Sequence, residues 1–127
     1  SWVSILTYFP KEIGCRSEYP KVSVLLAARN EEELILRCLE SMAQFNYPND
    51  KLEILIGDDA STDDTLKLVE AFIKDKPNFS VFSISEIRGK GRGKANVLGQ
   101  LAHKANGSFY FITDVDVKLP KDWILGL

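Results

Sequence analysis

Acidic side chains follow three separate apolar stretches of the sequence, each at the point where the stretch ends. The three sets are Arg29-Asn30-Glu31 after residues 22–27, Asp58-Asp59 after residues 52–56, and Asp114-Val115-Asp116 after residues 109–113. Carboxylates brought together from separate loops repel one another unless a cation or a hydrogen-bond donor lies among them. A metal ion or a ligand is therefore the simplest explanation. The alternative is that each aspartate only caps the next helix, which we favour for Asp63 and Asp64 but not for Asp58 and Asp116.

The pair Asp114 and Asp116 has the chemistry of a divalent-metal site. Carboxylates two positions apart on extended backbone project to the same side, and hard oxygen ligands suit Mg²⁺ or Mn²⁺. Such ions take one or two protein carboxylates and complete their shell with water and phosphate oxygens, so a bound diphosphate fits. The D-x-D spacing is frequent by chance, and it gains weight here because it follows the apolar run at residues 109–113.

A basic segment places four cations among three glycines at residues 88–94, just before a predicted helix. Backbone N–H groups, the helix dipole and these cations could together hold a phosphate. The segment is not a Walker P-loop, because Arg88 stands at the position of the first glycine and Ala95 at that of the magnesium-binding Ser or Thr. A solvated loop is the alternative for part of the segment, above all for Lys90 and Arg92.

Composition limits the classes of fold and of partner. The chain has 127 residues, of which 45% are hydrophobic, and 16 Lys+Arg against 18 Asp+Glu give a net charge of −2. These values are typical of one globular domain with a sizeable core. The slightly acidic balance gives no overall attraction for nucleic acid, so we expect no nucleic-acid partner.

Residues 1–20 are predicted to be an extension outside the main domain. The first ten residues lack the basic start of a signal peptide and are too few to span a bilayer, which takes about 20 apolar residues. Aromatic Trp2, Tyr8 and Phe9 leave two alternatives open. One is a juxtamembrane segment that associates the full-length protein with a membrane, and the other is a tail that packs on the domain.

The sequence has two cysteines, Cys15 and Cys38, and one histidine, His103. A structural zinc site takes four Cys or His ligands, so this chain has too few. We interpret the two cysteines as free thiols rather than as a disulfide. Free thiols favour a reducing compartment, which is the cytoplasm or the cytoplasmic face of a membrane.

Short apolar runs and longer periodic segments alternate along the chain. Strands are predicted at residues 22–27, 52–56, 79–84 and 109–113. The helices between them carry apolar residues at 3.6-residue spacing, namely Leu34, Ile35, Cys38, Leu39 and Met42 in the first, Leu66, Val69, Phe72 and Ile73 in the second, and Leu98, Leu101, Ala102 and Ala105 in the third. We expect residues 31–33, all glutamate, in the first turn of the first helix. Ser61 or Thr62 is expected to cap the second helix.

Strands separated by helices imply right-handed crossovers and a doubly wound α/β fold, with a mostly parallel sheet covered on both faces. With the four predicted strands numbered along the chain, we expect the order 3-2-1-4. In such a sheet, ligands bind beyond the carboxyl ends of the strands, where the strand order reverses. Arg29, Asp58 and Asp116 should therefore lie in one crevice, with the strands at 22–27 and 109–113 adjacent.

Four stretches of the chain together resemble the inverting glycosyltransferases of family 2, which have the Rossmann-like GT-A nucleotide-sugar fold. The matching stretches are VSVLLAARNEE at 22–32, ILIGDDASTDDT at 54–65, GKANVLGQLAHKANG at 93–107 and DVDVKLP at 114–120. They occur in the family's order and spacing. Ala27 and Ala60 replace a frequent proline and a frequent glycine, and we expect neither change to remove a ligand contact.

The resemblance implies a donor site for a nucleotide diphospho-sugar, most often a UDP-sugar, with Mg²⁺ or Mn²⁺ as cofactor. The residues carried over are Ala28, Arg29 and Glu31 for the nucleotide pocket, Asp58 for the base, Lys94 and Asn96 near the donor, Asp114 for the ribose or the sugar, and Asp116 for the metal ion. The metal ion would neutralise the leaving nucleoside diphosphate.

Members of this family continue beyond the D-x-D pair into an acceptor-binding half that carries the general base, and the motifs of that half are not in this sequence. We therefore interpret residues 21–127 as a truncated donor-binding domain with no catalytic residue of its own. The parent enzyme would transfer a sugar with inversion to an unidentified acceptor. The apolar residues Trp123, Ile124, Leu125 and Leu127 would then be left uncovered.

Two other functions compete with the one that the resemblance implies. The alternative that stays open is a non-catalytic nucleotide-binding or interaction module. A response-regulator receiver is disfavoured, because Arg29-Asn30 and Ser85-Glu86 stand where its paired acids and its phosphoacceptor belong.

Overall fold

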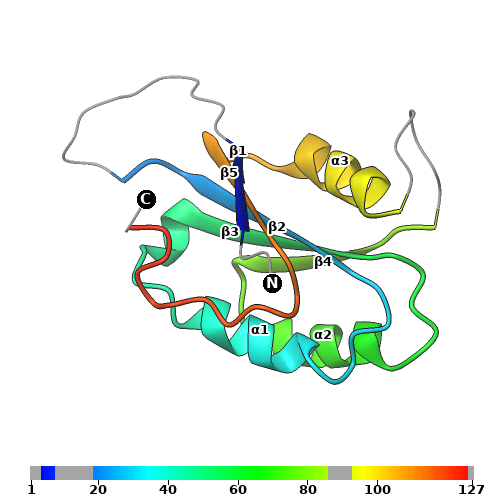
Figure 1. The fold of residues 1–127 in the computed structure, drawn as a ribbon. Helices are drawn as coiled ribbons and strands as arrows, with labels where there is room; N and C mark the ends of the chain where they lie inside the picture. Colours follow the sequence, from blue (N-terminus) through cyan, green and yellow to red (C-terminus); the bar gives the residue numbers. More distant parts are fainter. Residues whose placement is uncertain (1–3, 8–18, 86–92, 126–127) are drawn as a thin grey trace.

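A five-stranded sheet organises the computed structural model, which describes residues 4–7, 19–85 and 93–125. The strands are β1 (Ser4–Thr7), β2 (Val22–Ala28), β3 (Leu52–Asp58), β4 (Phe79–Ser83) and β5 (Phe109–Thr113). Their order across the sheet is β1-β5-β2-β3-β4 (Figure 1). Neighbours among β5, β2, β3 and β4 pair in parallel, which confirms the predicted 3-2-1-4 order of the four strands of the main domain.

The additional strand β1 comes from the N-terminal extension. It pairs antiparallel with β5, with Ser4 opposite Thr113 and Thr7 opposite Tyr110. Residues 4–7 of the extension therefore join the edge of the domain's sheet, and the choice between the two alternatives stays open. Residues 1–3 and 8–18, with Cys15 among them, lie outside the described part of the chain.

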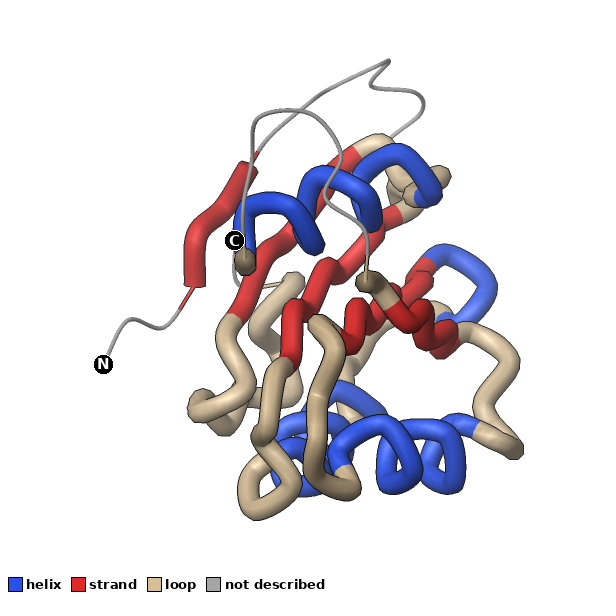
Figure 2. Tube along the Cα trace, turned by 90° about the vertical axis from the view of Figure 1, so that its right-hand side faces the viewer, coloured by secondary structure: helices blue, strands red, loops and turns tan. Residues whose placement is uncertain are grey.

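Three helices cover the two faces of the sheet. Helices α1 (Ile35–Ala43) and α2 (Thr65–Ile73) lie on one face and α3 (Lys94–Lys104) on the other, while the short 3₁₀ helix η1 (Asn49–Lys51) precedes β3 (Figures 1 and 2). The strands β2 and β3 are buried over almost their whole length, as continuous apolar runs predict for a sheet covered on both sides. No helix in residues 4–7, 19–85 and 93–125 is long and apolar enough to cross a membrane.

The residues on the buried face of α1 are those predicted, but the helix starts later in the sequence than predicted. Ile35, Cys38, Leu39 and Met42 are all buried. The helix begins at Ile35, so the three glutamates at residues 31–33 precede it and the expected acidic first turn is wrong. The backbone carbonyl of Glu31 instead accepts a hydrogen bond of 2.8 Å from the Ile35 N–H.

The residue whose side chain caps the start of α2 is also not one of those predicted. The Asp63 carboxylate accepts the Thr65 N–H at 2.9 Å, whereas Ser61 and Thr62 bond to Asn30 in the loop after β2. The expectation of Ser61 or Thr62 as cap is therefore wrong, because the other loop uses their hydrogen-bonding groups. On the inner face, Val69, Phe72 and Ile73 pack as predicted, with Leu68 in the place expected for Leu66.

Helix α3 packs through Val97, Leu98, Leu101, Ala102 and Ala105 against the second face of the sheet. All of these except Val97 were predicted. The packing is close enough to require a glycine in β3, because a Cβ atom on Gly57 would lie 2.3 Å from the Val97 side chain.

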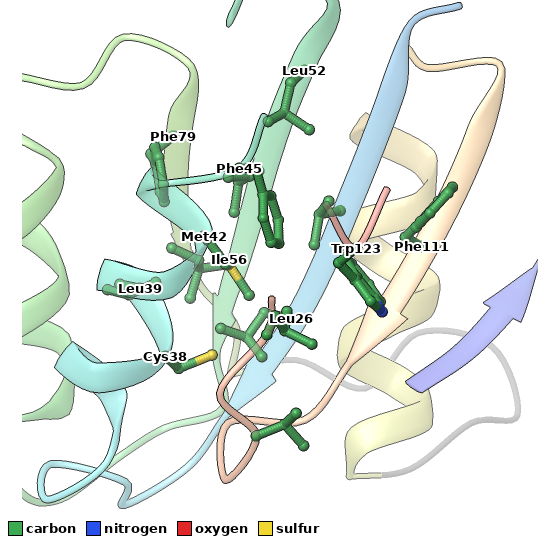
Figure 3. Close-up of a cluster of buried hydrophobic side chains, with 14 of the residues drawn as sticks. Leu26, Cys38, Leu39, Met42, Phe45, Leu52, Ile56, Phe79, Phe111 and Trp123 are labelled. Atoms are coloured by element: carbon green, nitrogen blue, oxygen red, sulfur yellow. The ribbon is translucent and has the colours of Figure 1, made fainter. Parts of the chain in front are cut away.

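The C-terminal segment contributes to the larger core instead of being left uncovered. Trp123 is 8% exposed and Ile124 is 7% exposed. The Trp123 ring stacks on Phe45, with 5.6 Å between centroids, and packs edge-on against Phe111 at 5.3 Å (Figure 3). The expectation of an exposed apolar patch is thus wrong for Trp123 and Ile124. It holds for Leu125, which is 47% exposed, and Leu127 lies outside the described residues.

Candidate functional site

A cavity of about 500 Å³ lies at the carboxyl ends of β2 and β5, which are adjacent in the sheet as predicted. Six of its ten lining residues are charged, and the lining comes from the end of β2, the segments after β2, β3 and β5 and the start of α3. The lining residues are Ala27, Ala28, Arg29, Glu31, Asp59, Gly93, Lys94, Asp114, Val115 and Asp116. Six of the eight predicted site residues therefore meet here. The two that do not line the cavity are Asp58 and Asn96.

Asp58 is the last residue of β3 and is buried, with 3% of its surface exposed. It pairs in register with Ala28, and its neighbour Asp59 lines the cavity, so it lies just behind the cavity wall. One carboxylate oxygen, Oδ2, accepts the Ser61 N–H at 3.3 Å. The other oxygen, Oδ1, is buried without a hydrogen-bond partner among the described residues. A buried acceptor left in this state costs about 1–3 kcal/mol, so a hydrogen bond from a ligand to Oδ1 would be favourable.

Asn96 lies in the first turn of α3, two residues after Lys94, and does not line the cavity. It is buried, and its Oδ1 accepts a hydrogen bond of 3.0 Å from Gln100, one turn further along the helix. The predicted place of Asn96 near the donor stays a prediction.

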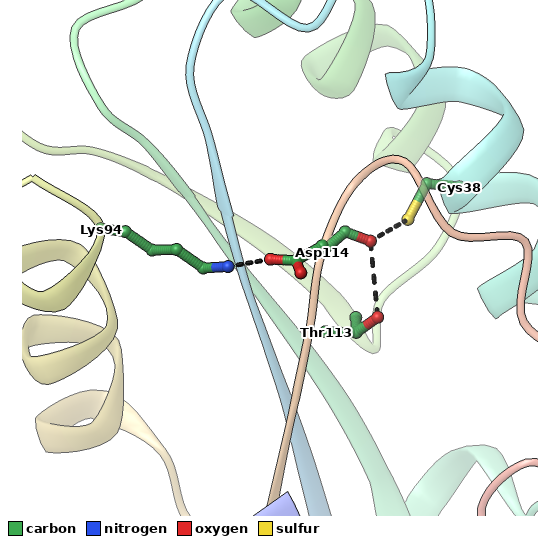
Figure 4. A network of polar contacts seen from close by, with 4 residues as sticks. All are labelled: Cys38, Lys94, Thr113 and Asp114. Atoms are coloured by element: carbon green, nitrogen blue, oxygen red, sulfur yellow. Dashed lines mark hydrogen bonds and ion pairs between the residues drawn. The ribbon is translucent and has the colours of Figure 1, made fainter. Parts of the chain in front are cut away.

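Lys94 and Asp114 form an ion pair across the cavity, between the first residue of α3 and the residue after β5 (Figure 4). The Asp114 side chain is 33% exposed and the Lys94 side chain is 51% exposed. Each group therefore neutralises the other when no ligand lies between them. Asp116, two residues further along, is exposed and makes no ion pair within the part of the chain that the structure describes.

The carboxylates at the cavity fit a metal ion that is coordinated mainly by the phosphate oxygens of a bound nucleotide and by water. In residues 4–7, 19–85 and 93–125, no group of three His, Cys, Asp or Glu side chains could hold a metal ion by itself. Mg²⁺ and Mn²⁺ accept one or two protein carboxylates when phosphate oxygens and water supply the rest. Asp116 offers one such carboxylate, and Asp114 could offer a second through Oδ2, because its contact with Lys94 is made by Oδ1.

The loops after β2 and β3 are joined by hydrogen bonds centred on Asn30, which sequence reasoning did not single out. Its Oδ1 accepts the N–H of Thr62 at 2.8 Å and that of Asp63 at 3.3 Å, and its own N–H donates to Ser61 Oγ at 2.9 Å. Asn30 also has a φ of 51°, a left-handed conformation that asparagine tolerates better than most residues. An asparagine directly after a predicted strand was the available signal for this turn.

Cys38 is a buried thiol behind the acidic pair. Burial, more than any nearby charge, raises its pKa from 9.0 to about 12, so the thiol stays protonated at neutral pH. Its Sγ lies 3.9 Å from the backbone oxygen of Asp114 (Figure 4). A protonated, buried thiol is neither a nucleophile nor a metal ligand. The interpretation of Cys38 as free agrees with the structure.

The basic segment is described only at its end. Residues 88–92 lie outside the described part of the chain, so their predicted contact with phosphate is not addressed. Gly93 and Lys94 line the cavity, and α3 starts at Lys94. Gly93 has φ 56° and ψ −128°, a conformation that glycine adopts readily and other residues rarely do. The positive end of the α3 dipole therefore lies at the cavity.

Comparison with known proteins identifies the family. The model of the glycosyl transferase family 2 matches residues 23–127, a range that holds every residue lining the cavity. The chain belongs to glycosyl transferase family 2. This confirms the resemblance noted in the sequence and the GT-A nature of the parallel sheet.

Individual relatives agree with the family assignment. YdaM of Bacillus subtilis (strain 168), described as a probable glycosyltransferase, is 37% identical over 107 residues, which are 84% of this chain and 25% of YdaM. A mannosyltransferase from Pyrobaculum calidifontis, solved with GDP-Man and Mn²⁺, is 33% identical with a TM-score of 0.73, over 82% of this chain and 30% of that one. Staphylococcus aureus TarS, solved with UDP-GlcNAc, is 31% identical with a TM-score of 0.70, over 84% of this chain and 29% of that one.

The chain spans only a part of these relatives. It covers 25%, 21% and 24% of the first three curated relatives that it matches.

Proposed function

We propose that this chain is the donor-binding part of an inverting glycosyltransferase and that its cavity binds a nucleotide diphospho-sugar, with a UDP-sugar as the first choice. The observation that carries the proposal is the buried Oδ1 of Asp58, which has no hydrogen-bond partner among the described residues and lies next to cavity-lining Asp59 in a family 2 fold. The acceptor, and any association of the full-length protein with a membrane, stay predictions.

Asp58 supplies the recognition of the base. A buried carboxylate oxygen without a donor favours a ligand that brings an N–H group, and uracil has one such group on its ring. Hydrogen bonds to a charged acceptor contribute about 1.5–3 kcal/mol, more than those between neutral groups. The rest of the nucleoside would lie against Ala28, Arg29 and Glu31, which form the neighbouring wall.

The diphosphate would lie between the cations and the acidic pair. Arg29, Lys94 and the start of α3 bring positive charge to the cavity, and Asp116 brings a carboxylate that makes no ion pair with another described residue. A Mg²⁺ or Mn²⁺ ion held by Asp116 supplies electrostatic neutralisation of the leaving nucleoside diphosphate. Asp114 would face the ribose or the sugar, exchanging its contact with Lys94 for one with the ligand.

The solved relatives support nucleotide sugars and a divalent metal, but they differ in the base. The Pyrobaculum calidifontis enzyme was solved with GDP-Man and Mn²⁺, and TarS with UDP-GlcNAc. A ring N–H exists on both uracil and guanine, so Asp58 alone does not separate them. The test therefore compares UDP with GDP.

The experiment is an NMR titration of this chain with UDP and with GDP, each in Mg²⁺ and in EDTA. We expect weak binding, with a Kd on the order of 1 mM, which corresponds to about −4 kcal/mol. Asp116→Asn should abolish the gain from Mg²⁺, because it removes the charge without changing the volume. Asp58→Asn should weaken binding equally in Mg²⁺ and in EDTA, because its partner is the base.

The matched control is Asp50→Asn, which removes an exposed carboxylate in η1, away from the residues that line the cavity. It should bind like the wild type in every condition. Equal binding by the wild-type chain in Mg²⁺ and in EDTA would refute the metal-binding role of Asp116. Absence of binding at several-fold above the expected Kd would refute the donor site itself.

A further inference from the structure

The stretch after β5 alternates between buried and exposed positions. Val115, Val117 and Leu119 are 4%, 8% and 3% exposed and belong to the large core, whereas Asp116 is exposed and Asp114 is half-buried. The backbone makes a turn at residues 115–116, so the extended backbone expected for the acidic pair is wrong. Asp114 and Asp116 line the cavity together with Val115, and Val117 and Leu119 pack in the core.

Side chains of α1 hold the backbone of this same stretch. Three residues of one helical surface take part, and each contacts a main-chain atom. The contacts are Arg37 Nη2 to Asp116 O at 3.0 Å, Cys38 Sγ to Asp114 O at 3.9 Å, and Leu119 N to Ser41 Oγ at 3.3 Å. Both backbone carbonyls of the D-x-D pair are thus held by the helix, while the carboxylates line the cavity.

Arg37 differs from the other two helix residues in its surroundings. Cys38 and Ser41 are buried, so any change there disturbs the core, whereas Arg37 is exposed. The Asp116 carbonyl is its hydrogen-bond partner within the described residues, across 79 positions of sequence. Arg37 does not line the donor cavity. It can therefore influence a ligand there only through the residue that it holds.

We propose that Arg37 is a positioning residue that fixes the backbone of Asp116 and so directs its carboxylate toward a metal ion on the donor diphosphate. This inference rests on the proposed function of the cavity. Anchoring the carbonyl restricts the backbone torsions on either side of it, and the carboxylate of an exposed residue then loses less freedom when it binds a metal ion. Residues that orient metal ligands change metal affinity by about 10–100-fold when they are replaced.

The first measurement is binding of UDP to this chain by NMR in Mg²⁺ and in EDTA, for the wild type and for Arg37→Gln. Because Arg37 contacts a carbonyl and not the carboxylate, we expect the lower end of that range, a loss on the order of tenfold in the gain from Mg²⁺. Binding in EDTA should stay unchanged. Arg37→Lys keeps a charged donor and should retain most of the gain. Lys67→Gln, which removes an exposed cation from α2, should behave like the wild type.

The second measurement needs no nucleotide. Amide hydrogen exchange at residues 115–118 should be faster in Arg37→Gln than in the wild type, with the amides of β5 unchanged. If exchange and the gain from Mg²⁺ are both unaltered in Arg37→Gln, the positioning role is wrong. It is also wrong if binding in EDTA falls by the same factor as binding in Mg²⁺. If the wild type gains nothing from Mg²⁺ but exchange still changes, the proposed metal site fails while the anchoring of Asp116 by Arg37 stands.

Discussion

The two sides of the cavity are built differently. On one side, the loops after β2 and β3 are joined by several hydrogen bonds, including those of Asn30 and one of 2.8 Å from the Glu31 N–H to Thr65 Oγ1. On the other side, the start of α3 and the stretch after β5 meet through a single described ion pair, Lys94 with Asp114. The two loops on the side proposed for the nucleoside are thus joined before binding. On the side proposed for the diphosphate and metal, α1 holds the backbone after β5, but the contact of that stretch with α3 is a charge pair that a ligand can replace.

This difference suits the two parts of the proposed ligand. A base is recognised by a few directional hydrogen bonds, which are most favourable when the acceptors are already in place. A diphosphate with its metal ion carries large charges of both signs, and binding it requires the existing charges to change partners. The predictions that follow test the contrast through the stability of the folded chain, from the largest expected change to the smallest.

Asn30→Ala should cause the largest loss, because it removes the acceptor that joins the two loops. We expect the free energy of unfolding to fall by about 2–4 kcal/mol, from hydrogen bonds of about 1 kcal/mol each and from alanine in a left-handed conformation. Urea denaturation measures the change. Asn30→Gly is the matched control, since it also removes the acceptor but relieves the backbone, and after the added freedom of the unfolded chain it should lose about 0.5 kcal/mol less. An equal loss in both variants would show that the conformation of residue 30 contributes nothing.

Ala60→Gly should raise the free energy of unfolding instead of lowering it. Ala60 has a φ of 51°, in the left-handed region where a Cβ atom costs about 1 kcal/mol. Glycine removes this cost but adds freedom to the unfolded chain, so we expect a net gain of about 0.5 kcal/mol in the free energy of unfolding. Urea denaturation beside Ala71→Gly, an exposed position inside α2, checks the result, because the helical variant should lose about 1 kcal/mol. A loss at both positions would contradict the assigned strain.

The contrast between the two sides also explains what the sequence predicted and what it did not. The sheet order followed from apolar runs separated by helices, because burial on both faces leaves a local pattern in β2 and β3. The helix starts did not follow, because the groups of Ser61 and Thr62 that were expected to cap α2 are used by Asn30 in another loop. Such partners lie more than thirty positions away, and no local pattern encodes them.

The candidate site was predicted better for its charges than for its packing. Arg29, Asp114 and Asp116 meet at the cavity because each follows a strand, and strand ends share one edge of the sheet. Asn96 does not line the cavity, because a resemblance gives a position in a motif but not the direction of the side chain. The burial of Trp123 was missed because its partners, Phe45 and Phe111, come from distant parts of the chain.

Asp63 gives the side proposed for the nucleoside a dependence on acid pH. Desolvation raises the pKa of its carboxyl, but hydrogen bonds from the Thr65 side chain and from the Thr65 and Glu32 backbone outweigh it, so the pKa lies below the usual 3.8. The unfolded chain therefore binds a proton more readily than the folded one. The stabilisation from these bonds is fully present above the unfolded pKa and is lost as the pH falls through the folded pKa.

We expect the free energy of unfolding of Asp63→Asn to depend less on pH below pH 3.8 than that of the wild type. Urea denaturation at a series of pH values measures the difference. Asp64→Asn is the control, since Asp64 makes no capping hydrogen bond with its side chain at the start of α2. If Asp64→Asn changes the pH dependence of the free energy of unfolding below pH 3.8 as much as Asp63→Asn does, the assignment to Asp63 is wrong.

Lys94→Gln should change stability least, by at most about 0.5 kcal/mol, because ion pairs this exposed contribute little to folding. Its effect on binding should be larger. Lys94 is proposed to leave Asp114 for the diphosphate, so the variant should bind UDP more weakly in Mg²⁺ and lose part of the salt dependence of binding. Asp114→Asn, which frees Lys94 without removing its charge, should instead bind UDP at least as tightly in EDTA as the wild type. If both variants weaken binding in EDTA equally, the intact pair itself is part of the site, and the exchange of partners on this side of the cavity does not occur.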